Sequence, residues 1–432
     1  MIKNLYIEKL FGRFNYNITL KPNGITIITG PNGFGKSTIL KIIDSLSKEK
    51  IQYLIGLDFS KIEITFDETK TIIEKNGSDF FIDGISLLFF KNTQDDYMIH
   101  CRRRGYFRKT SDGYIDMRTG RRYTDDEFDY DFLQDDDFWE EIMSYGNEER
   151  YPKELIQLKQ KLKEISENCG RIRLISEQRL IRRETQPRRT DEIRTVDVIS
   201  DLPEQLKKEI QKVYDEYSRV SNKLDSSYPE RLFATKDGLE SKNEFTERLN
   251  DTNEKFKKLN QYGLVDISII DSKKYNSEHS TALKIYFDDF SEKFKVFHEL
   301  IQKLDLFTSI INERLTFKKI LITRTDGFKI VDEENEEKTL ELSQLSSGEK
   351  QEIVLFYELI FNTKSEFLLL IDEPEISLHI MWQKKFMDDL LAVSKQTKIS
   401  AVVATHSPQI VSKHWDIQID LGEMYGVQLD SM

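Results

Sequence analysis

The sequence predicts an α/β fold in which the two ends of the chain meet in one sheet, and three observations carry this prediction. The first 30 residues are rich in β-forming side chains and lead directly into a helical pattern over 36–47. Near the other end, an apolar strand over 367–371, a helix over 380–394 and a strand over 399–404 follow one another, which is typical of a parallel sheet. Most of the residues between these ends are charged and helical in pattern, so we expect a helical lobe or short arm inserted into the α/β part.

Local patterns predict the individual elements. Strands are expected over 2–10, 16–20 and 25–29, and β-like segments between 61 and 100 indicate an antiparallel meander. Apolar residues of the middle region follow helical spacing only in short stretches, so an extended coiled coil is not expected. The other expected elements are helices over 151–168, 202–224, 242–259, 290–315 and 347–361, and strands over 171–175, 320–323 and 328–331.

Three segments follow from these elements. We expect residues 1–178 to form the N-terminal part of the α/β domain, with the meander and a loop-rich insertion at about 85–170. Residues 179–316 are expected to form the helical insertion, and residues 317–432 the C-terminal part of the α/β domain.

Composition limits the class of protein. The 432 residues exceed the size of an ordinary domain, and the net charge of −12 argues against a protein that coats nucleic acid over its whole surface. The two cysteines, Cys101 and Cys169, form no CxxC pair, so a disulfide framework or a zinc hook is not expected. The N-terminus predicts a strand instead of a signal peptide, and no apolar run approaches the ~18 residues that span a bilayer. We therefore expect a cytoplasmic protein without a membrane partner.

The motif Gly30-x4-Gly35-Lys36-Ser37 lies between a predicted strand and a predicted helix, which is the setting of a phosphate-binding loop. Glycines let the backbone wrap around phosphates, and the following helix adds the positive end of its dipole. Lys36 is expected to reach the β- and γ-phosphates and the Ser37 hydroxyl to bind Mg²⁺. An ordinary glycine turn is the alternative, but it does not account for the complete motif. With ATP and Mg²⁺ as the expected cofactors, the nucleotide-binding candidates are Gly30, Asn32, Gly33, Gly35, Lys36, Ser37 and Thr38.

Two carboxylates, Asp372 and Glu373, follow the apolar strand over 367–371. The last residues of a buried parallel strand reach the carboxyl edge of the sheet, where ligands bind. We expect Asp372 to hold Mg²⁺ through water and Glu373 to polarise the attacking water, which makes Glu373 and Lys36 candidate catalytic residues. An exposed acidic turn is the alternative.

A turn of small residues, Ser346-Ser347-Gly348-Glu349, opens the helix predicted over 347–361. Such a turn presents free N–H groups and a hydroxyl to an anion, although a plain helix cap has the same appearance. Its position just over twenty residues before Asp372 resembles the signature motif of ABC ATPases. That family usually has Gln where this chain has Glu349, and Glu is familiar in the branch related to recombination proteins.

Together these motifs resemble the ABC-type ATPases of the SMC, RecF and OLD group. The resemblance covers about residues 1–66, 171–180 and 317–422. It implies an α/β fold of the ABC-type ATPase head, with a mixed sheet, an antiparallel β-meander and an inserted helical lobe or short arm. The sequences that favour this branch are Glu375-Ile376-Ser377-Leu378-His379, Ser346-Ser347-Gly348-Glu349-Lys350-Gln351 and Thr405-His406-Ser407-Pro408.

The resemblance also implies roles for further residues. His406 matches the histidine that contacts the γ-phosphate, and Gln178 lies where the class keeps a glutamine that touches the metal. Ser377 and His379 resemble the loop that crosses a dimer interface, in which Ser346 and Gly348 would clamp ATP bound at the partner's phosphate loop. A structural histidine is the alternative for His406, and simple packing is the alternative for His379.

Basic residues outside these motifs have two interpretations. Arg13 and Phe14 occupy the first β-turn, where related ATPases place groups near the nucleotide, although a plain surface turn is an equal alternative. A cluster of arginines follows Gln178 and indicates either a solvated loop or contact with nucleic acid or an acidic partner. Its members are Arg179, Arg182, Arg183, Arg188, Arg189 and Arg194.

The function implied by the resemblance is that of an ATPase which forms a homodimer or higher oligomer around ATP. An OLD-type nuclease domain is not recognisable after His406, so we expect no nuclease site in this chain. The layout resembles the ATPase subunit of Septu-type anti-phage systems, which implies a separate nuclease subunit of the HNH type, with DNA as a further possible ligand. The alternative is a RecF- or SMC-like clamp for DNA repair or chromosome handling, without a nuclease partner. A transporter ATPase is disfavoured by the 166 residues between Gln178 and Leu345.

Overall fold

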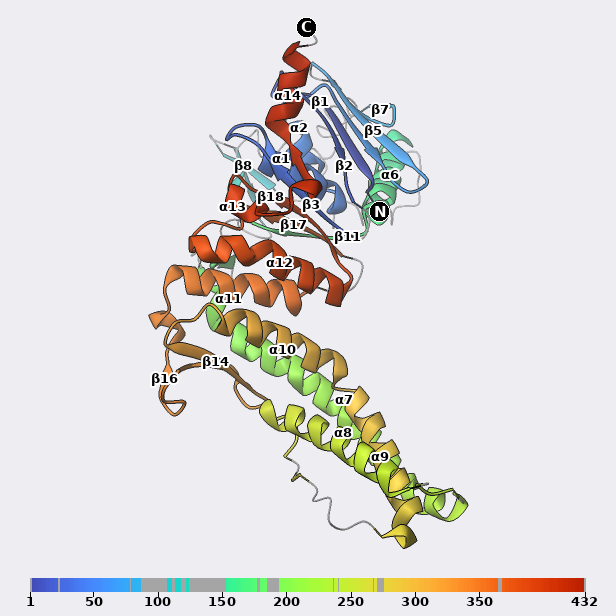
Figure 1. Cartoon of the computed structure of the whole chain (residues 1–432). Coiled ribbons are helices and arrows are strands. Elements are labelled where there is room, and N and C mark those ends of the chain that lie inside the picture. The colour runs from blue at the N-terminus through green and yellow to red at the C-terminus, as the bar shows by residue number, and fades with distance from the viewer. Residues whose placement is uncertain are drawn as a thin grey trace. The chain divides into compact units, whose positions relative to one another are not determined.

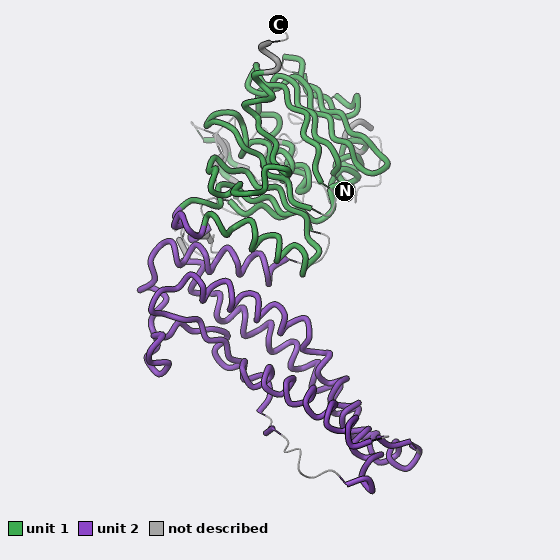
Figure 2. The backbone as a smooth tube through the Cα atoms, in the orientation of Figure 1, with its two compact units in different colours: residues 1–177, 365–376, 383–432 green, residues 178–364, 377–382 purple. Residues whose placement is uncertain are grey.

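A computed structural model of the chain divides into two compact units (Figure 2). The first unit comprises residues 1–177, 365–376 and 383–432, and the second comprises residues 178–364 and 377–382. The structure describes residues 2–21, 24–77, 79–86, 107–110, 113–117, 122–123, 153–176, 179–184, 194–235, 237–239, 241–266, 268–269, 276–363 and 367–430.

A parallel sheet of five strands forms the centre of the first unit, in the order β11-β17-β18-β3-β19. Its central strands are apolar and buried along nearly their whole length, as expected for a parallel sheet covered on both faces. Strand β3 comes from the N-terminal end of the chain and pairs with β18 and β19 from the C-terminal end, so the predicted meeting of the two ends is confirmed. The strands are β3 (Ile25–Thr29), β11 (Arg171–Ile175), β17 (Phe367–Asp372), β18 (Ser400–Ala404) and β19 (Gln418–Asp420).

An antiparallel sheet of six strands also belongs to the first unit, in the order β2-β1-β4-β5-β6-β7. Buried and exposed side chains alternate along β4, because one face of the strand packs on the core. The predicted meander is thus present as far as Ser86, and the rest of its expected range, residues 87–100, lies outside the described residues. The strands are β1 (Asn4–Leu10), β2 (Phe14–Thr19), β4 (Lys61–Thr65), β5 (Lys70–Asn76), β6 (Asp79–Ile82) and β7 (Ile85–Ser86).

Helix α1 (Lys36–Ser47) packs against β11, β17 and β18, and α6 (Lys153–Cys169) packs against α1 (Figure 1). The apolar side of α1 is fully buried, since Ile39, Leu40 and Ile43 join the core that the two sheets share. The helix begins at Lys36 as its periodicity predicts, which places its N-terminus directly after the phosphate loop. The smaller elements of this unit are α2 (Ile51–Ile55), β8 (Phe107–Thr110), β9 (Gly113–Asp116), β10 (Arg122–Tyr123), α13 (Pro408–Val411), η5 (Trp415–Ile417) and α14 (Leu421–Asp430).

Four helices dominate the second unit: α7 (Val198–Ala234), α8 (Lys242–Gln261), α9 (Ser280–Lys295) and α10 (His298–Asn312). The α7 and α9 helices pack together and are joined by a bidentate ion pair, in which Arg231 Nη1 and Nη2 lie 2.5 and 2.7 Å from the Asp289 carboxylate oxygens.

The single helix predicted over 290–315 is wrong, because α9 ends at Lys295 and α10 begins at His298. No glycine or proline marks this break. Instead, the Phe297 side chain is fully buried at the corner, and its N–H bonds to Phe294 O at 2.9 Å. Tertiary packing therefore divides the helix, and the spacing of apolar residues in the sequence does not reveal this packing.

The second unit also contains a three-stranded antiparallel sheet, in the order β14-β15-β16, and helix α11. Residues 317–364, which the sequence analysis places with the C-terminal part of the α/β domain, belong to this unit. They do so because β14 packs on α10, and α11 packs on α7 and α10. The remaining elements are β12 (Ile181–Glu184), β13 (Arg194–Asp197), η3 (Ser277–His279), β14 (Lys318–Thr323), β15 (Gly327–Asp332), β16 (Thr339–Leu340), η4 (Leu342–Gln344) and α11 (Ser347–Ile360), while α12 (Ile380–Thr397) begins in the second unit and continues in the first.

The predicted fold class is confirmed: the chain is α/β, with an antiparallel meander and an inserted set of helices. The mixed sheet that the resemblance implies is not found among the described residues, because parallel and antiparallel strands occupy separate sheets. Over the part of the chain that the structure describes, no helix combines the length and the apolar character needed to cross a membrane.

Candidate nucleotide site

The phosphate loop joins the end of β3 to the first turn of α1. Gly35 caps the helix in the left-handed region at φ 85°, and a Cβ at this position would lie 2.9 Å from Leu10 Cδ2. The N–H groups of the first turn of α1 therefore point out of the helix end, where the helix dipole favours an anion.

Lys36 is held inside this loop. Its side chain is buried, and Nζ donates to Gly30 O at 2.9 Å and to Pro31 O at 3.4 Å. The two carbonyl oxygens thus accept two of the three hydrogen bonds that the Lys36 ammonium can donate. Phosphate oxygens can take their place, so the geometry suits the role predicted for Lys36. The backbones of Asn32 and Gly33, the other loop candidates, form the exposed turn of the loop, and Thr38 belongs to the first turn of α1.

Aromatic side chains pack behind the loop. The Phe14 ring is buried, with its centroid 5.0 Å from that of Phe34 in the loop and 5.1 Å from that of Tyr425. Tyr16 Oη donates to Phe34 O at 2.8 Å, and burial raises the pKa of the Tyr16 phenol. The position of Phe14 therefore suits support of the loop instead of direct contact with a nucleotide, whereas Arg13 is exposed.

Two oxygen groups meet beside the loop. Ser37 Oγ, in the first turn of α1, donates to Asp372 Oδ1 at the end of β17, at 2.8 Å. A hydroxyl and a carboxylate are hard oxygen ligands of the kind that Mg²⁺ takes together with waters and phosphates, so this pair fits a magnesium ion. Gln178, the third candidate ligand, lies outside the described residues.

Glu373 follows Asp372 in an unusual backbone conformation. Its φ of 46° lies in the left-handed region, which is rare for a residue with a side chain, and its N–H bonds to Ala404 O at 2.9 Å. The Glu373 carboxylate lies near the phosphate loop, with Oε1 3.9 Å from Lys36 Nζ. Burial, followed by the nearby carboxylate of Glu375, raises the pKa of Glu373 to about 7, and His406 opposes this shift.

His406, directly after β18, completes this cluster. Its Nδ1 lies 2.5 Å from Glu373 Oε2 and 3.2 Å from Glu375 Oε1, and the ring is half exposed. The parallel sheet thus brings three predicted residues, Lys36, Glu373 and His406, to one edge, although they are up to 370 positions apart in the sequence. This arrangement can bind phosphate, hold a metal beside it and accept a proton.

The predicted signature turn forms a capping box at the start of α11. Ser346 Oγ accepts from Glu349 N at 3.3 Å, and Glu349 Oε2 accepts from Ser346 N at 2.8 Å. Lys318 Nζ, from β14, donates to both Glu349 carboxylate oxygens at 2.8 and 3.0 Å. Burial of Glu349 disfavours its charged form, but Lys318 and the Ser346 donors outweigh this effect and lower the pKa of Glu349. The Glu349 carboxylate thus forms an ion pair with Lys318, which an uncharged glutamine at this position could not form.

The predicted interface loop lies beside this turn in the second unit. A Cβ on Gly348 would approach Ser377 O to 2.7 Å, so only glycine lets the two backbones come this close. Ser377 has a left-handed φ of 65°, and His379 Nδ1 accepts from Met381 N at 3.3 Å. The side chains of Ser346, Ser347, Ser377 and His379 are exposed, so this part of the second unit offers a free polar surface.

Comparison with known proteins assigns the family. A family model described as an AAA ATPase domain matches residues 1–411. The chain belongs to the AAA ATPase domain family. The match spans both units and includes every candidate site residue named above.

Three solved structures are similar to this AAA ATPase domain. The first, an SMC head bound to the C-terminal winged-helix domain of ScpA, is 12% identical with a TM-score of 0.36, and the alignment covers 95% of this chain and 92% of that one. The second, an SMC head with an extended coiled coil bound to the C-terminal domain of ScpA from Pyrococcus furiosus, is 13% identical with a TM-score of 0.36, covering 95% and 91%. The third, the SMC head from Thermotoga maritima, is 14% identical with a TM-score of 0.32, covering 95% and 90%. At these values the likeness carries no inference about function. No curated protein matches the chain.

The arginine cluster of this AAA ATPase domain is only partly described. Arg179 is buried, with 7% of its surface exposed, so its side chain is not free to contact nucleic acid in this conformation. The backbones of Arg182 and Arg183 lie in β12 and that of Arg194 begins β13, and these strands pair as a hairpin. Arg188 and Arg189 lie outside the described residues.

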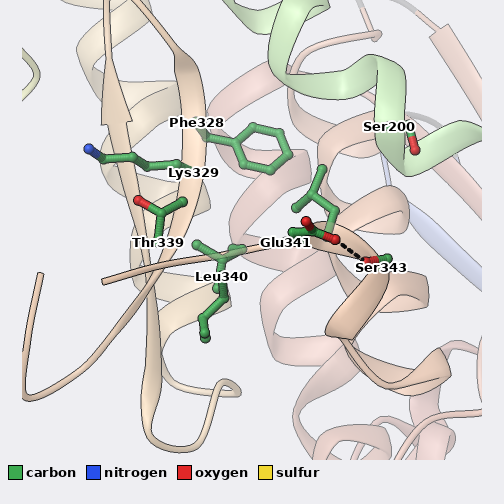
Figure 3. Close-up of a pocket in the computed structure, with 9 residues that line it drawn as sticks. Ser200, Phe328, Lys329, Thr339, Leu340, Glu341 and Ser343 are labelled. Carbon is green, nitrogen blue, oxygen red and sulfur yellow. Dashed lines mark hydrogen bonds between the residues drawn. The ribbon is translucent and has the colours of Figure 1, made fainter. Parts of the chain in front are cut away.

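A shallow pocket of about 420 Å³ lies in the second unit of this AAA ATPase domain, between β15, β16 and the start of α7 (Figure 3). Its lining includes Phe328, Lys329 and Leu340, and Ser343 Oγ donates to Glu341 at 3.0 Å at one side. None of the predicted site residues lines it, so the pocket is separate from the nucleotide site.

The structure adds two residues that sequence reasoning did not assign. Glu375 begins the sequence Glu375-Ile376-Ser377-Leu378-His379, and it lies three residues after Asp372. This short spacing from the end of the apolar strand could have indicated a second buried acid. Lys318 gave no signal, because its contact with Glu349 depends on how β14 packs near α11.

Lys318→Met should lower the free energy of unfolding of the second unit by about 1–2 kcal/mol, because it leaves the mostly buried Glu349 carboxylate without its cation. Hydrogen exchange of the α11 amides measures this as roughly 5- to 30-fold faster opening. The matched control is Lys338→Met, which removes the more exposed ion pair with Asp332 and should cost about 0–1 kcal/mol. Equal effects of the two substitutions would show that the Lys318 pair has no special role.

Proposed function

We propose that this AAA ATPase domain binds and hydrolyses ATP at the loop around Lys36. The observation that carries the proposal is the convergence of three groups at one sheet edge: the buried Lys36 ammonium, the Ser37–Asp372 oxygen pair and the Glu373 carboxylate. A phosphate cradle, a metal-binding pair and a base are the parts that phosphoryl transfer to water requires.

In this mechanism the triphosphate lies along the N-terminus of α1. Lys36 leaves the carbonyl oxygens of Gly30 and Pro31 and donates to phosphate oxygens, which places its charge where negative charge develops. Ser37 and Asp372 would hold magnesium, which would supply neutralisation of the phosphate charge when bound. Glu373 accepts a proton from the attacking water, and a carboxyl pKa of about 7 makes it an effective base near neutral pH.

We further propose that two copies of the chain assemble around ATP. The surface around Ser346 and Gly348 would contact the triphosphate held by the partner's phosphate loop. Two observations support this proposal: the Ser346 and Ser347 side chains at the start of α11 are exposed, and the adjacent Ile380 and Met381 side chains are 51% and 55% exposed. ATP would then stabilise the dimer, and hydrolysis would release it.

The biological role that we propose is regulation of a separate HNH-type nuclease in anti-phage defence, with DNA as a possible ligand. The support is the resemblance of the chain's layout to the ATPase subunit of Septu-type systems. Among the residues that the structure describes, the group of His, Cys, Asp and Glu close enough to hold an ion is Glu373, Glu375 and His406, which belongs to the ATP site. In this proposal, DNA cleavage is the work of a partner protein.

The test of this role is expression of the chain with its neighbouring genes. If an adjacent reading frame encodes an HNH nuclease, we expect the two proteins to co-purify and together to reduce phage plating by at least about tenfold. A neighbourhood of replication or recombination genes, with no loss of plating, would instead favour a repair or chromosome clamp.

A further inference from the structure

Glu375 is a buried acid just after β17 that takes no direct part in the chemistry above. Only 6% of its surface is exposed. Its Oε1 accepts three hydrogen bonds from the segment after β18, from Thr405 Oγ1 at 2.5 Å, His406 N at 3.0 Å and Ser407 N at 3.1 Å. Three donors on one carboxylate oxygen fix the segment 405–407 firmly, because hydrogen bonds to a charged acceptor are strong.

His406 is the residue that this arrangement orients. Its backbone N–H is tied to Glu375, and its ring Nδ1 lies 3.2 Å from the same Glu375 oxygen. That ring nitrogen also lies 2.5 Å from Glu373 Oε2. The next residue is held as well, since Ser407 Oγ donates to Gln383 Oε1 at 2.8 Å. The imidazole therefore has little freedom to turn away from Glu373.

We propose that Glu375 is a positioning residue for ATP hydrolysis, which holds segment 405–407 so that His406 stays aligned with Glu373. The inference rests on the proposed ATPase function and adds to it a residue that touches neither the nucleotide nor the attacking water. Such a residue acts on the rate through geometry, and displacement of a catalytic group by about 1 Å can cost about 100-fold in rate.

A bound cation is the competing interpretation of the same cluster, since the side chains of Glu373, Glu375 and His406 lie close enough to ligate one. Two contacts disfavour it. Glu375 Oε1 already accepts three hydrogen bonds, and the Lys36 ammonium lies 3.9 Å from Glu373 Oε1, where it would repel a second cation.

The first test compares Glu375→Ala with Glu375→Gln. The alanine variant should lose about 10- to 100-fold in kcat while its Kd for ATP stays within about threefold, because the phosphate loop keeps its contacts. Glutamine keeps an oxygen that can accept the same three hydrogen bonds, in a side chain of nearly the same shape. Glu375→Gln should therefore restore kcat to within about fivefold of the wild type. Glu68→Ala, an exposed carboxylate of the same unit, is the matched control and should change neither quantity.

The second test asks whether Glu375 acts through His406. If it does, Glu375→Ala added to His406→Ala should lower kcat by no more than about twofold, because the group being positioned is already gone. Should the alanine variant fail to fold, Thr405→Val removes one of the three donors and should lower kcat about 3- to 10-fold at unchanged ATP affinity.

Full additivity in the double variant, or equal losses in kcat and in ATP binding, would overturn the positioning role. A wild-type protein that hydrolyses no ATP would overturn the proposed function itself. An active wild type with an equally active, folded Glu375→Ala would overturn only the role of Glu375, so the two failures are distinguishable.

Discussion

Glu373→Gln is expected to lower steady-state ATP hydrolysis about 100- to 1,000-fold while leaving ATP binding intact, because removal of a general base typically has this cost. Glutamine has almost the same shape as glutamate, and its one amide oxygen can face either His406 Nδ1 or Lys36 Nζ, which lie beside different carboxylate oxygens of Glu373. It cannot accept a proton from water. A phosphate-release assay and a nucleotide-binding titration measure the two quantities separately.

The same variant should accumulate as an ATP-bound dimer. ATP that is bound but not cleaved keeps its γ-phosphate, and the proposed assembly depends on that phosphate meeting the Ser346–Gly348 surface of the partner. Light scattering with excess ATP should therefore show about twice the monomer mass of 51.0 kDa. Without nucleotide the mass should remain that of the monomer.

A second substitution provides the control for this dimer. Gly348→Ala places a Cβ 2.7 Å from Ser377 O, which must displace the turn at the proposed interface. Gly348 lies in the second unit and the phosphate loop in the first, so ATP binding should persist while the dimer is lost. Dimer formation by Glu373→Gln/Gly348→Ala at the same ATP concentration, or none by Glu373→Gln alone, would contradict the proposed assembly.

How far the sequence predicts this site depends on whether the chemistry is local. The phosphate loop and α1 are defined by adjacent residues, and the predicted strand 25–29 and helix 36–47 agree with the structure to the residue. The order of strands along the chain also predicts that Asp372 and Ser37 reach the same edge, because parallel strands end together there.

What the sequence does not predict is set by tertiary packing. Glu373 has a left-handed backbone although it is neither glycine nor asparagine, the residues that usually indicate this conformation. The conformation is accompanied by the hydrogen bond from Glu373 N to Ala404 O in the neighbouring strand. Likewise, the three donors on Glu375 come from a segment about 30 positions away. Strand β19 has only three residues, too few for a pattern, yet it adds to the sheet beside β3.

Lys36→Ala is expected to lower the affinity for ATP by about 100-fold or more and to abolish measurable hydrolysis. The Lys36 ammonium is the buried cation nearest to the carbonyl oxygens that line the loop, and its loss removes at least one charge-assisted bond to phosphate. A 100-fold change corresponds to about 2.7 kcal/mol, the scale of one or two such bonds. Isothermal titration with a slowly hydrolysed ATP analogue measures it.

The matched control for Lys36→Ala is Lys41→Ala, which removes an exposed lysine from the same helix and should leave both ATP affinity and turnover unchanged. The loop of Lys36→Ala should otherwise keep its form, since Gly35 caps α1 and Phe14 packs behind Phe34 without help from Lys36. Because both the dimer and the control of a partner nuclease depend on bound ATP in the proposed function, this one substitution should also abolish ATP-induced assembly and any protection against phage. A Lys36→Ala protein that binds ATP with unchanged affinity would place the nucleotide elsewhere in the chain and would contradict the site proposed here.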